Sequence, residues 1–158
     1  MTALGLAVSF PLVSGWSILA DLFVENSPMH SAPYFTALGL FTILHAIRVI
    51  RLRRKHKVGI GSGGVPELEQ MSRVFGNFME YAPMGLVLLL ALEFVAAPRW
   101  FIHLCGMPLL IGRTLHSLGL SRSTLASKER VYGMILTFAS ILLASVGVLI
   151  FSFLAPRF

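Results

Sequence analysis

The sequence predicts an all-α integral membrane protein, a four-helix transmembrane bundle that gains a fifth helix if an N-terminal apolar segment also spans. Of the 158 residues, 56% are hydrophobic and 13% are charged, whereas soluble domains carry about 25% charged residues. The apolar residues also form runs of roughly 20, the helix length that crosses about 30 Å of hydrocarbon. We divide the chain into an apolar extension, 1–30, and a transmembrane domain, 31–158.

The extension holds an apolar run at 3–24, which Pro11 and Gly15 interrupt. Three interpretations are open: an extra membrane helix, which we favour; a kinked or interfacial helix; and upstream translation before a natural start at Met29. A signal peptide is disfavoured, because no basic region precedes the run and no convincing small-residue cleavage site is present.

The next apolar run, 34–50, leads into a dense basic cluster. Cytoplasmic loops of membrane proteins are enriched in Lys and Arg, and a second basic loop belongs on the same side two spans later. We therefore expect both loops in the cytoplasm, in contact with anionic lipid. The net charge of +6 follows from this topology, so we expect no nucleic-acid partner. The first loop carries Arg48, Arg51, Arg53, Arg54, Lys55 and Lys57, and the second carries Arg122, Lys128 and Arg130.

A glycine-rich stretch, VGIGSGG, follows the basic cluster and formally contains GxGxxG at Gly59, Gly61 and Gly64. A dinucleotide-binding fingerprint must follow a strand and open a helix within a βαβ unit. Here the stretch follows a membrane helix, so we interpret it as a flexible connection.

The spacing predicts a long helix from Pro66 to about Ala97. Proline suits the first helical turn, and Glu67 and Glu69 favour the N-terminal end of the helix dipole. Pro83 lies in the interior and removes a backbone hydrogen bond, which predicts a kink.

One face of this helix is polar over several turns. At 100° per residue, a set of polar side chains shares one side of the cylinder, and the deeper ones lie within the hydrocarbon. Ionisable groups at that depth usually mark a functional site. The alternative is an internal polar clamp that only holds helices together. The face comprises Glu69, Gln70, Arg73, Asn77 and Glu80.

Two further spans are expected at 100–118, which carries Arg113, and at 131–154. Small residues at Ser140, Ala144 and Gly147 favour close helix packing in lipid. We interpret His103 as a packing histidine, and no second ligand at suitable spacing predicts a metal site. The single cysteine excludes an intrachain disulfide.

The segment RVFGNFMEYAP, 73–83, resembles the second-helix signature of the MAPEG family, the membrane-associated proteins in eicosanoid and glutathione metabolism. The later segment CGMPLLIGRTLHSLGL resembles small bacterial members, and the resemblance covers about 34–154. It implies a left-handed four-helix bundle that assembles as a homotrimer in the bacterial inner membrane. It further implies that glutathione binds as a co-substrate between subunits, near the cytoplasmic side.

The resemblance also implies roles for individual residues. Glutathione would contact Arg73, Asn77, Glu80 and Tyr81, with Arg113 at a similar level on the following helix. Arg53 or Arg54 would lie near the ligand opening. The catalytic, thiol-activating arginine would be Arg130, which we favour over Arg122.

The chemistry of these residue types fits glutathione, which has two carboxylates, an ammonium and a thiol. Arg73 supplies a forked cation, Glu80 a carboxylate, and Arg130 a cation that lowers the thiol pKa and favours the nucleophilic thiolate. The implied function is a transferase or peroxidase acting on an apolar electrophile from the bilayer. The alternative is a non-catalytic membrane protein that binds a lipid or thiol ligand, because His116 and Leu120 replace tyrosines that family transferases carry.

Overall fold

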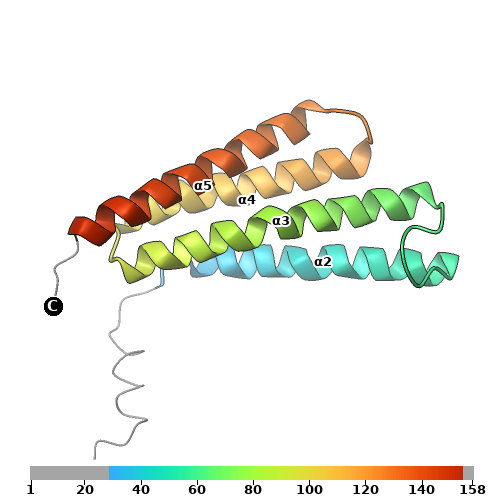
Figure 1. The fold of residues 1–158 in the computed structure, drawn as a ribbon, viewed down its shortest axis with the longest axis horizontal. Helices are drawn as coiled ribbons and strands as arrows, with labels where there is room; N and C mark the ends of the chain where they lie inside the picture. Colours follow the sequence, from blue (N-terminus) through green and yellow to red (C-terminus); the bar gives the residue numbers. More distant parts are fainter. Residues whose placement is uncertain (1–28, 155–158) are drawn as a thin grey trace, which may run out of the picture.

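The structure is a computed structural model that describes residues 29–154, so the apolar run at 3–24 lies outside the described residues. The described part is all helical, with four long helices joined by short connections (Figure 1). The helices are α2 (Ala32–His56), α3 (Pro66–Phe94), α4 (Arg99–Arg122) and α5 (Lys128–Leu154).

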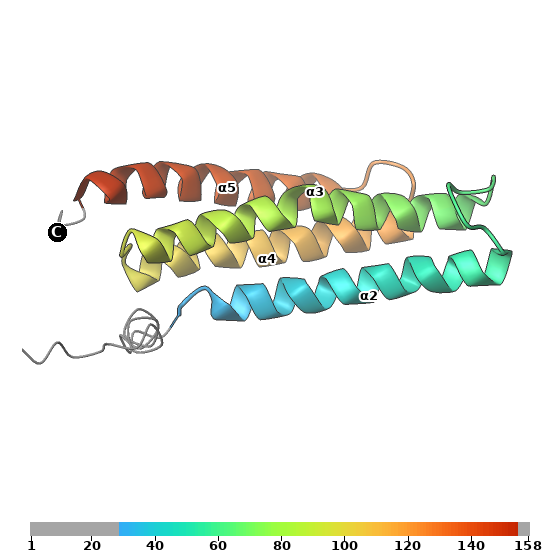
Figure 2. The same ribbon diagram turned by 60° about the horizontal axis from the view of Figure 1, so that its bottom comes forward.

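The four helices run side by side along the long axis of the molecule (Figures 1 and 2). Helix α3 packs against all three others, and α4 packs most extensively against α5. Helices α2 and α5 lie on opposite sides of α3 and α4 and do not contact each other (Figure 2). Residues of α3 therefore meet α4 and α5 on one side and α2 on the other.

Three of the described helices, α2, α3 and α5, are long and apolar enough to cross a membrane. Helix α4 has 24 residues and, at about 1.5 Å per residue, extends for roughly 36 Å beside them. Its buried Arg113 lowers its mean hydropathy without shortening it. The prediction of an all-α membrane bundle with four helices in the transmembrane domain is confirmed.

Small residues bring α4 and α5 into backbone contact. A Cβ atom added at Gly112 would lie 2.7 Å from the carbonyl oxygen of Gly133, and one added at Gly133 would lie 2.6 Å from the backbone nitrogen of His116. Further along, Ser140 Oγ donates a hydrogen bond of 2.7 Å to the Cys105 carbonyl. The close packing predicted for α5 is confirmed, since Ser140 is buried together with Ala144 and Gly147.

The glycine-rich connection closes α2 and leads into α3. Lys57 ends α2 in the left-handed conformation, and Gly61, Gly63 and Gly64 also have positive φ angles. These angles suit glycine because they would strain other residues. The stretch is thus a connection between helices, as predicted. Helix α3 begins at Pro66 and continues without interruption through Pro83.

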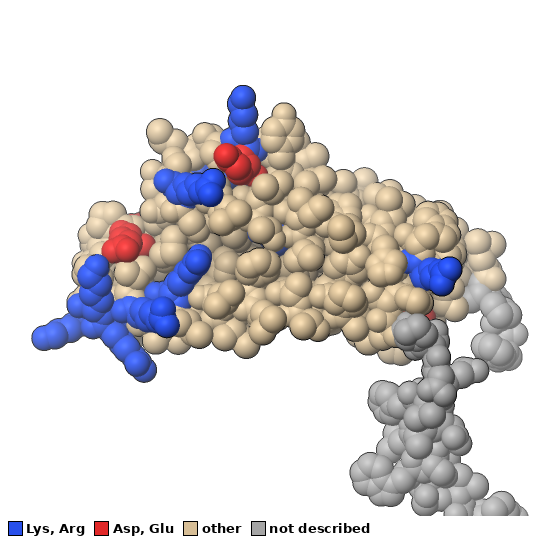
Figure 3. Space-filling view, turned by 180° about the vertical axis from the view of Figure 1, so that it is seen from behind, with Lys and Arg blue, Asp and Glu red and all other residues tan. Residues whose placement is uncertain are grey.

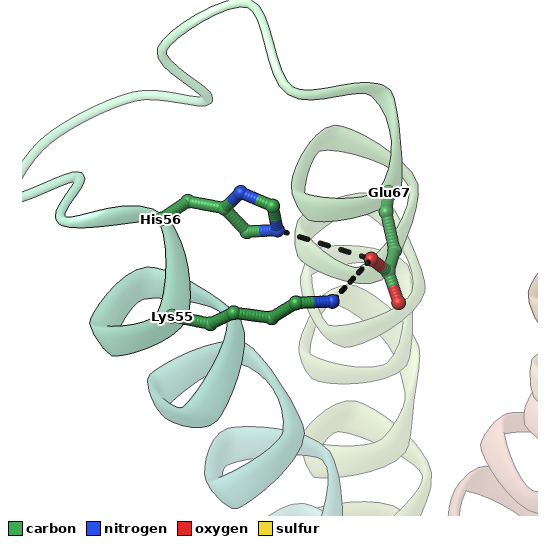
Figure 4. A network of polar contacts seen from close by, with 3 residues as sticks. All are labelled: Lys55, His56 and Glu67. Atoms are coloured by element: carbon green, nitrogen blue, oxygen red, sulfur yellow. Dashed lines mark ion pairs between the residues drawn. The ribbon is translucent and has the colours of Figure 1, made fainter.

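Basic side chains gather at the end of the bundle that holds the α2–α3 and α4–α5 connections (Figures 1 and 3). We call this the basic end. There, Lys55 Nζ and His56 Nε2 lie 3.8 Å and 4.0 Å from a carboxylate oxygen of Glu67 (Figure 4). The Lys55 and Glu67 side chains are largely exposed, so this ion pair contributes at most about 1 kcal/mol. It links the last turn of α2 to the first turn of α3.

The opposite end of the bundle is tied by hydrogen bonds between helices. The backbone N–H of Ser31 donates to Glu93 Oε1 at 2.7 Å, which fixes the start of α2 against the end of α3. Tyr34 Oη lies 2.9 Å from His103 Nδ1 on α4. His103 therefore takes part in helix packing, in agreement with the sequence-based interpretation.

Candidate functional site

A cavity of about 380 Å³ lies at the basic end, where the first turns of α3 face the end of α4 and the start of α5. Its volume falls within the roughly 300–1,000 Å³ of small-molecule sites. Most of its polar lining comes from the predicted polar face of α3. The lining residues are Pro66, Glu69, Gln70, Arg73, Asn77, His116, Leu120, Thr124 and Arg130.

Arg113 of α4 organises the inner part of this site although its side chain is completely buried, with 0% exposure. Its Nη2 donates to Asn77 Oδ1 on α3 at 2.6 Å and lies 3.3 Å from His116 Nδ1. Because a guanidinium has no acceptor, His116 Nδ1 must accept. Nη1 contacts the Met134 sulfur at 3.8 Å. Arg113 thereby holds the two inner lining side chains, Asn77 and His116, in fixed positions.

Aromatic rings complete the surroundings of Arg113. The guanidinium carbon lies 5.4 Å from the ring centre of Tyr81 and 5.9 Å from that of Phe78, distances at which a cation is attracted by an aromatic face. The Tyr81 ring in turn packs edge-on against Phe138 of α5 at 5.6 Å. Tyr81 thus lies beneath the cavity, against Arg113, and does not line it.

Gln70 and Arg130 shape the outer part of the cavity. Gln70 Nε2 donates to the Leu120 carbonyl at 2.8 Å and so satisfies a carbonyl near the end of α4. Arg130 Nη1 donates to the carbonyls of Thr124 and Leu125 at 3.2 and 2.9 Å, which fixes the α4–α5 connection. Both contacts use the same nitrogen, Nη1, and the Arg130 side chain also lines the cavity.

The comparisons with known proteins fit this architecture. The model of the MAPEG family matches residues 31–150. The chain belongs to the MAPEG family. It is similar to the inner membrane protein YecN of Escherichia coli K12, with 36% identity over 115 residues that cover 73% of this chain and 86% of YecN. The YecN protein of E. coli O6:H1 matches with the same identity and coverage. The resemblance drawn from the sequence is confirmed, and this MAPEG protein is an integral protein of the inner membrane.

The structure of this MAPEG chain brings together four of the residues proposed from the sequence. Arg73, Asn77 and Arg130 line one cavity, and Arg113 hydrogen-bonds to Asn77 behind it. Of the two candidates for the thiol-activating arginine, Arg130 lines the cavity, whereas Arg122 is exposed and lies outside its lining.

Two proposed residues of the MAPEG chain lie apart from this cavity within a single subunit. Glu80 is exposed and is not among the lining residues. Arg53 donates from Nη1 to the Gly59 carbonyl at 3.1 Å and lines a separate surface hollow together with Arg54. Their roles in ligand binding stay predictions.

Sequence reasoning did not assign His116 or Gln70 to the site. The signal for His116 was its position three residues after Arg113, which places both side chains on one face of α4. The signal for Gln70 was its place on the polar face of α3. Its contact with the Leu120 carbonyl depends on how α3 and α4 pack, which the sequence pattern does not specify.

Proposed function

We propose that this protein is a glutathione-dependent transferase or peroxidase that acts on an apolar electrophile from the membrane. The observation that carries the proposal is the cavity at the basic end, where Arg73 and Arg130 face the same space beside the carboxylate of Glu69. Two cations and one anion in a small-molecule cavity suit a ligand that carries carboxylates, an ammonium and a thiol. Family membership supports the same ligand.

Two of the three charged groups of glutathione have a complementary side chain in the cavity. Arg73 presents forked donors suited to a glutathione carboxylate, and Glu69 presents acceptors for its ammonium group. Asn77, held by Arg113 at 2.6 Å, offers a fixed polar group one helical turn beyond Arg73. Arg130 lies across the cavity from α3 and is left as the cation beside the thiol.

The role of Arg130 follows from thiol chemistry. A guanidinium beside sulfur stabilises the thiolate, which is the nucleophilic form. In a transfer, the thiolate sulfur forms a bond to an electrophilic carbon, and the leaving group departs with the bonding electrons. In a peroxidase reaction, the sulfur attacks a peroxide oxygen, the O–O bond breaks, and the departing alkoxide takes up a proton and leaves as an alcohol. The sulfenic acid formed on the sulfur then reacts with a second glutathione to give the disulfide and water.

We further propose that the site is completed by self-association into a homotrimer. Glu80 is exposed on a membrane-spanning helix, where a carboxylate facing lipid would be costly. A neighbouring subunit would cover Glu80 and add it to the ligand site, and Arg53 would lie near the opening. Both basic loops would face the cytoplasm, which labelling of an Ile60→Cys variant by a membrane-impermeant maleimide would check, since Ile60 is 94% exposed.

The test of the catalytic proposal is ultraviolet difference absorbance of the thiolate when glutathione is added to the purified trimer. We expect a saturable thiolate signal in the wild type, its loss in Arg130→Ala, and its retention in Arg122→Ala. Arg122 is the matched control, because it belongs to the same end of the bundle but does not line the cavity. An unchanged signal in Arg130→Ala would rule out its role.

A non-catalytic binding protein is the second candidate, and one observation favours it. His116 and Leu120 line the cavity at positions where the resemblance implies tyrosines in family transferases. Under this alternative, glutathione or another thiol binds saturably without any thiolate signal. The same titration therefore separates the two candidates.

A further inference from the structure

A second cavity, of about 80 Å³, lies among α2, α3 and α4 and is distinct from the site described above. Arg113 connects the two, because it lines this second cavity while Asn77 and His116, which it contacts, line the first. Apolar side chains such as Phe41 and Phe78 form much of the second lining. We call this space the α2–α4 cavity.

Three polar side chains that line the α2–α4 cavity each have a buried atom without a hydrogen-bond partner in the described part of the chain. These atoms are Nε2 of His45, Oγ of Ser117 and Nε of Arg113. The side chains belong to residues that are only 5%, 6% and 0% exposed, respectively. Buried polar groups are normally hydrogen-bonded, so three such atoms around one cavity point to a polar occupant.

The donors and acceptors specify what this occupant must offer. His45 Nδ1 donates to the Phe41 carbonyl at 2.8 Å, so Nε2 of the neutral ring is an acceptor. Arg113 Nε can only donate, and the Ser117 hydroxyl can do either. A carboxyl group satisfies all three if it enters as the acid and passes its proton to His45 Nε2. One carboxylate oxygen then accepts from Arg113 and Ser117, and the other accepts from the protonated His45 Nε2.

The charge of Arg113 favours a carboxyl group over a neutral hydroxyl. Among residues 29–154 Arg113 forms no ion pair, and its nearest partners are the Asn77 amide, the His116 ring and aromatic faces. The Glu80 carboxylate acts on Arg113 electrostatically but lies beyond ion-pair distance, and a buried cation without a direct counter-ion is costly. The carboxylate of a ligand would supply one on the Nε side of the guanidinium.

The edge of the cavity indicates where the rest of the ligand lies. Leu44 and Leu118 line the cavity and are 52% and 43% exposed, so they face the apolar surroundings of the bundle. Arg48, which is exposed, lies on the lining one helical turn closer to the basic end than Leu44. An acid with a long apolar tail could thus enter from the membrane with its tail left along these leucines.

We propose that the α2–α4 cavity binds the carboxyl end of an amphipathic acid of the fatty-acid class, through Arg113, Ser117 and His45. The proposal does not depend on glutathione binding, because its own determinants, Ser117 and His45, lie outside the lining of the first cavity.

The probe is radiolabelled oleate, added to the full chain in nanodiscs of zwitterionic lipid and compared with empty nanodiscs. We expect saturable binding that Ser117→Ala weakens about tenfold, since the lost hydrogen bond is to a charged group. Ser121→Ala is the matched control: it removes the same hydroxyl from the same cavity lining, but that hydroxyl already donates to the Ser117 carbonyl at 2.7 Å. It should bind oleate as the wild type does.

Two further measurements keep the test decisive if a variant does not fold. Oleyl alcohol, which has the same tail and no carboxyl group, should compete with oleate at least tenfold less well on the wild-type protein. His45→Phe keeps a ring against Phe78 and removes Nε2, so it should also weaken oleate binding. Non-saturable binding, equal affinity for the alcohol, or equal effects of the two serine variants would overturn the proposal. Glutathione titrations on the same nanodiscs report separately on the first cavity.

Discussion

Arg113 is a completely buried cation whose closest hydrogen bond, 2.6 Å to Asn77 Oδ1, joins α4 to α3. Aromatic faces of Phe78 and Tyr81 surround the rest of the guanidinium. This arrangement spreads the charge over neutral partners and keeps Asn77 oriented in the cavity lining. The interaction between Arg113 and Asn77 should therefore affect both stability and ligand binding.

Replacing Asn77 with alanine should destabilise the protein by about 2 kcal/mol, because a hydrogen bond to a buried charged group is lost. Unfolding by a denaturing detergent in mixed micelles measures this change in the free energy of unfolding. Asn77→Asp is the control, because it keeps the acceptor and adds a counter-charge, so its stability should match or exceed that of the wild type. Equal stability of Asn77→Ala and the wild type would contradict the structural role of this contact.

The sequence predicted the polar side of α3 correctly, but not how far along the helix the cavity reaches. At 100° per residue Glu80 lies within about 20° of Arg73 around the helix, yet it is about 10 Å further along the axis. The cavity is lined no deeper on α3 than Asn77, because the packed rings of Tyr81 and Phe138 follow. Helical periodicity reports the face of a residue, whereas contacts such as Asn77–Arg113 depend on how two helices pack.

At the scale of elements, the contact between α4 and α5 positions both His116 and Arg130. Gly112 and Gly133 let the two backbones touch, and the α4–α5 connection is fixed by the two carbonyl contacts of Arg130. The small residues on α5 made close packing predictable from the sequence. The partner helix was not predictable. Glycines occur in every described helix, and the sequence pattern does not distinguish which of these helices packs against α5.

A methyl group at Gly112 should separate these helices. In Gly112→Ala the new Cβ would lie 2.7 Å from the Gly133 carbonyl oxygen and 3.0 Å from the Thr137 nitrogen, both backbone atoms that cannot move aside. We expect a destabilisation of about 1–3 kcal/mol and a lower Tm in detergent. Gly39→Ala is the control, since no atom lies within 4 Å of its added Cβ. A Gly112→Ala Tm equal to that of Gly39→Ala would show that this close approach does not limit stability.

At the scale of the whole molecule, the two cavities and the exposed Glu80 relate the subunit to its surroundings. The first cavity opens among the charged residues of the basic end, and the α2–α4 cavity is edged by lipid-exposed leucines. A water-soluble thiol and an amphipathic acid would therefore approach from different environments. Arg113 contacts the lining of the first cavity and itself lines the second. A ligand bound in one cavity would therefore change the surroundings of the other through this side chain.

The fold was predictable at this scale because apolar runs, basic loops and the motif at 73–83 all carry strong sequence signals. Assembly into a homotrimer stays a prediction, because the exposure of a residue such as Glu80 in one chain does not specify which surface covers it. Its position on the membrane-spanning part of α3 is the reason to expect a neighbouring subunit there.

Glutathione binding to the detergent-purified protein, measured by calorimetry, tests the central claim most directly. We expect saturable binding to the wild type and to Arg122→Ala. Binding should be at least tenfold weaker in Arg73→Ala, which loses a forked contact to a carboxylate, and weaker in Glu80→Gln, with every variant folded. Unchanged binding in Arg73→Ala, or no binding by folded wild-type protein, would contradict the assignment of this cavity to glutathione.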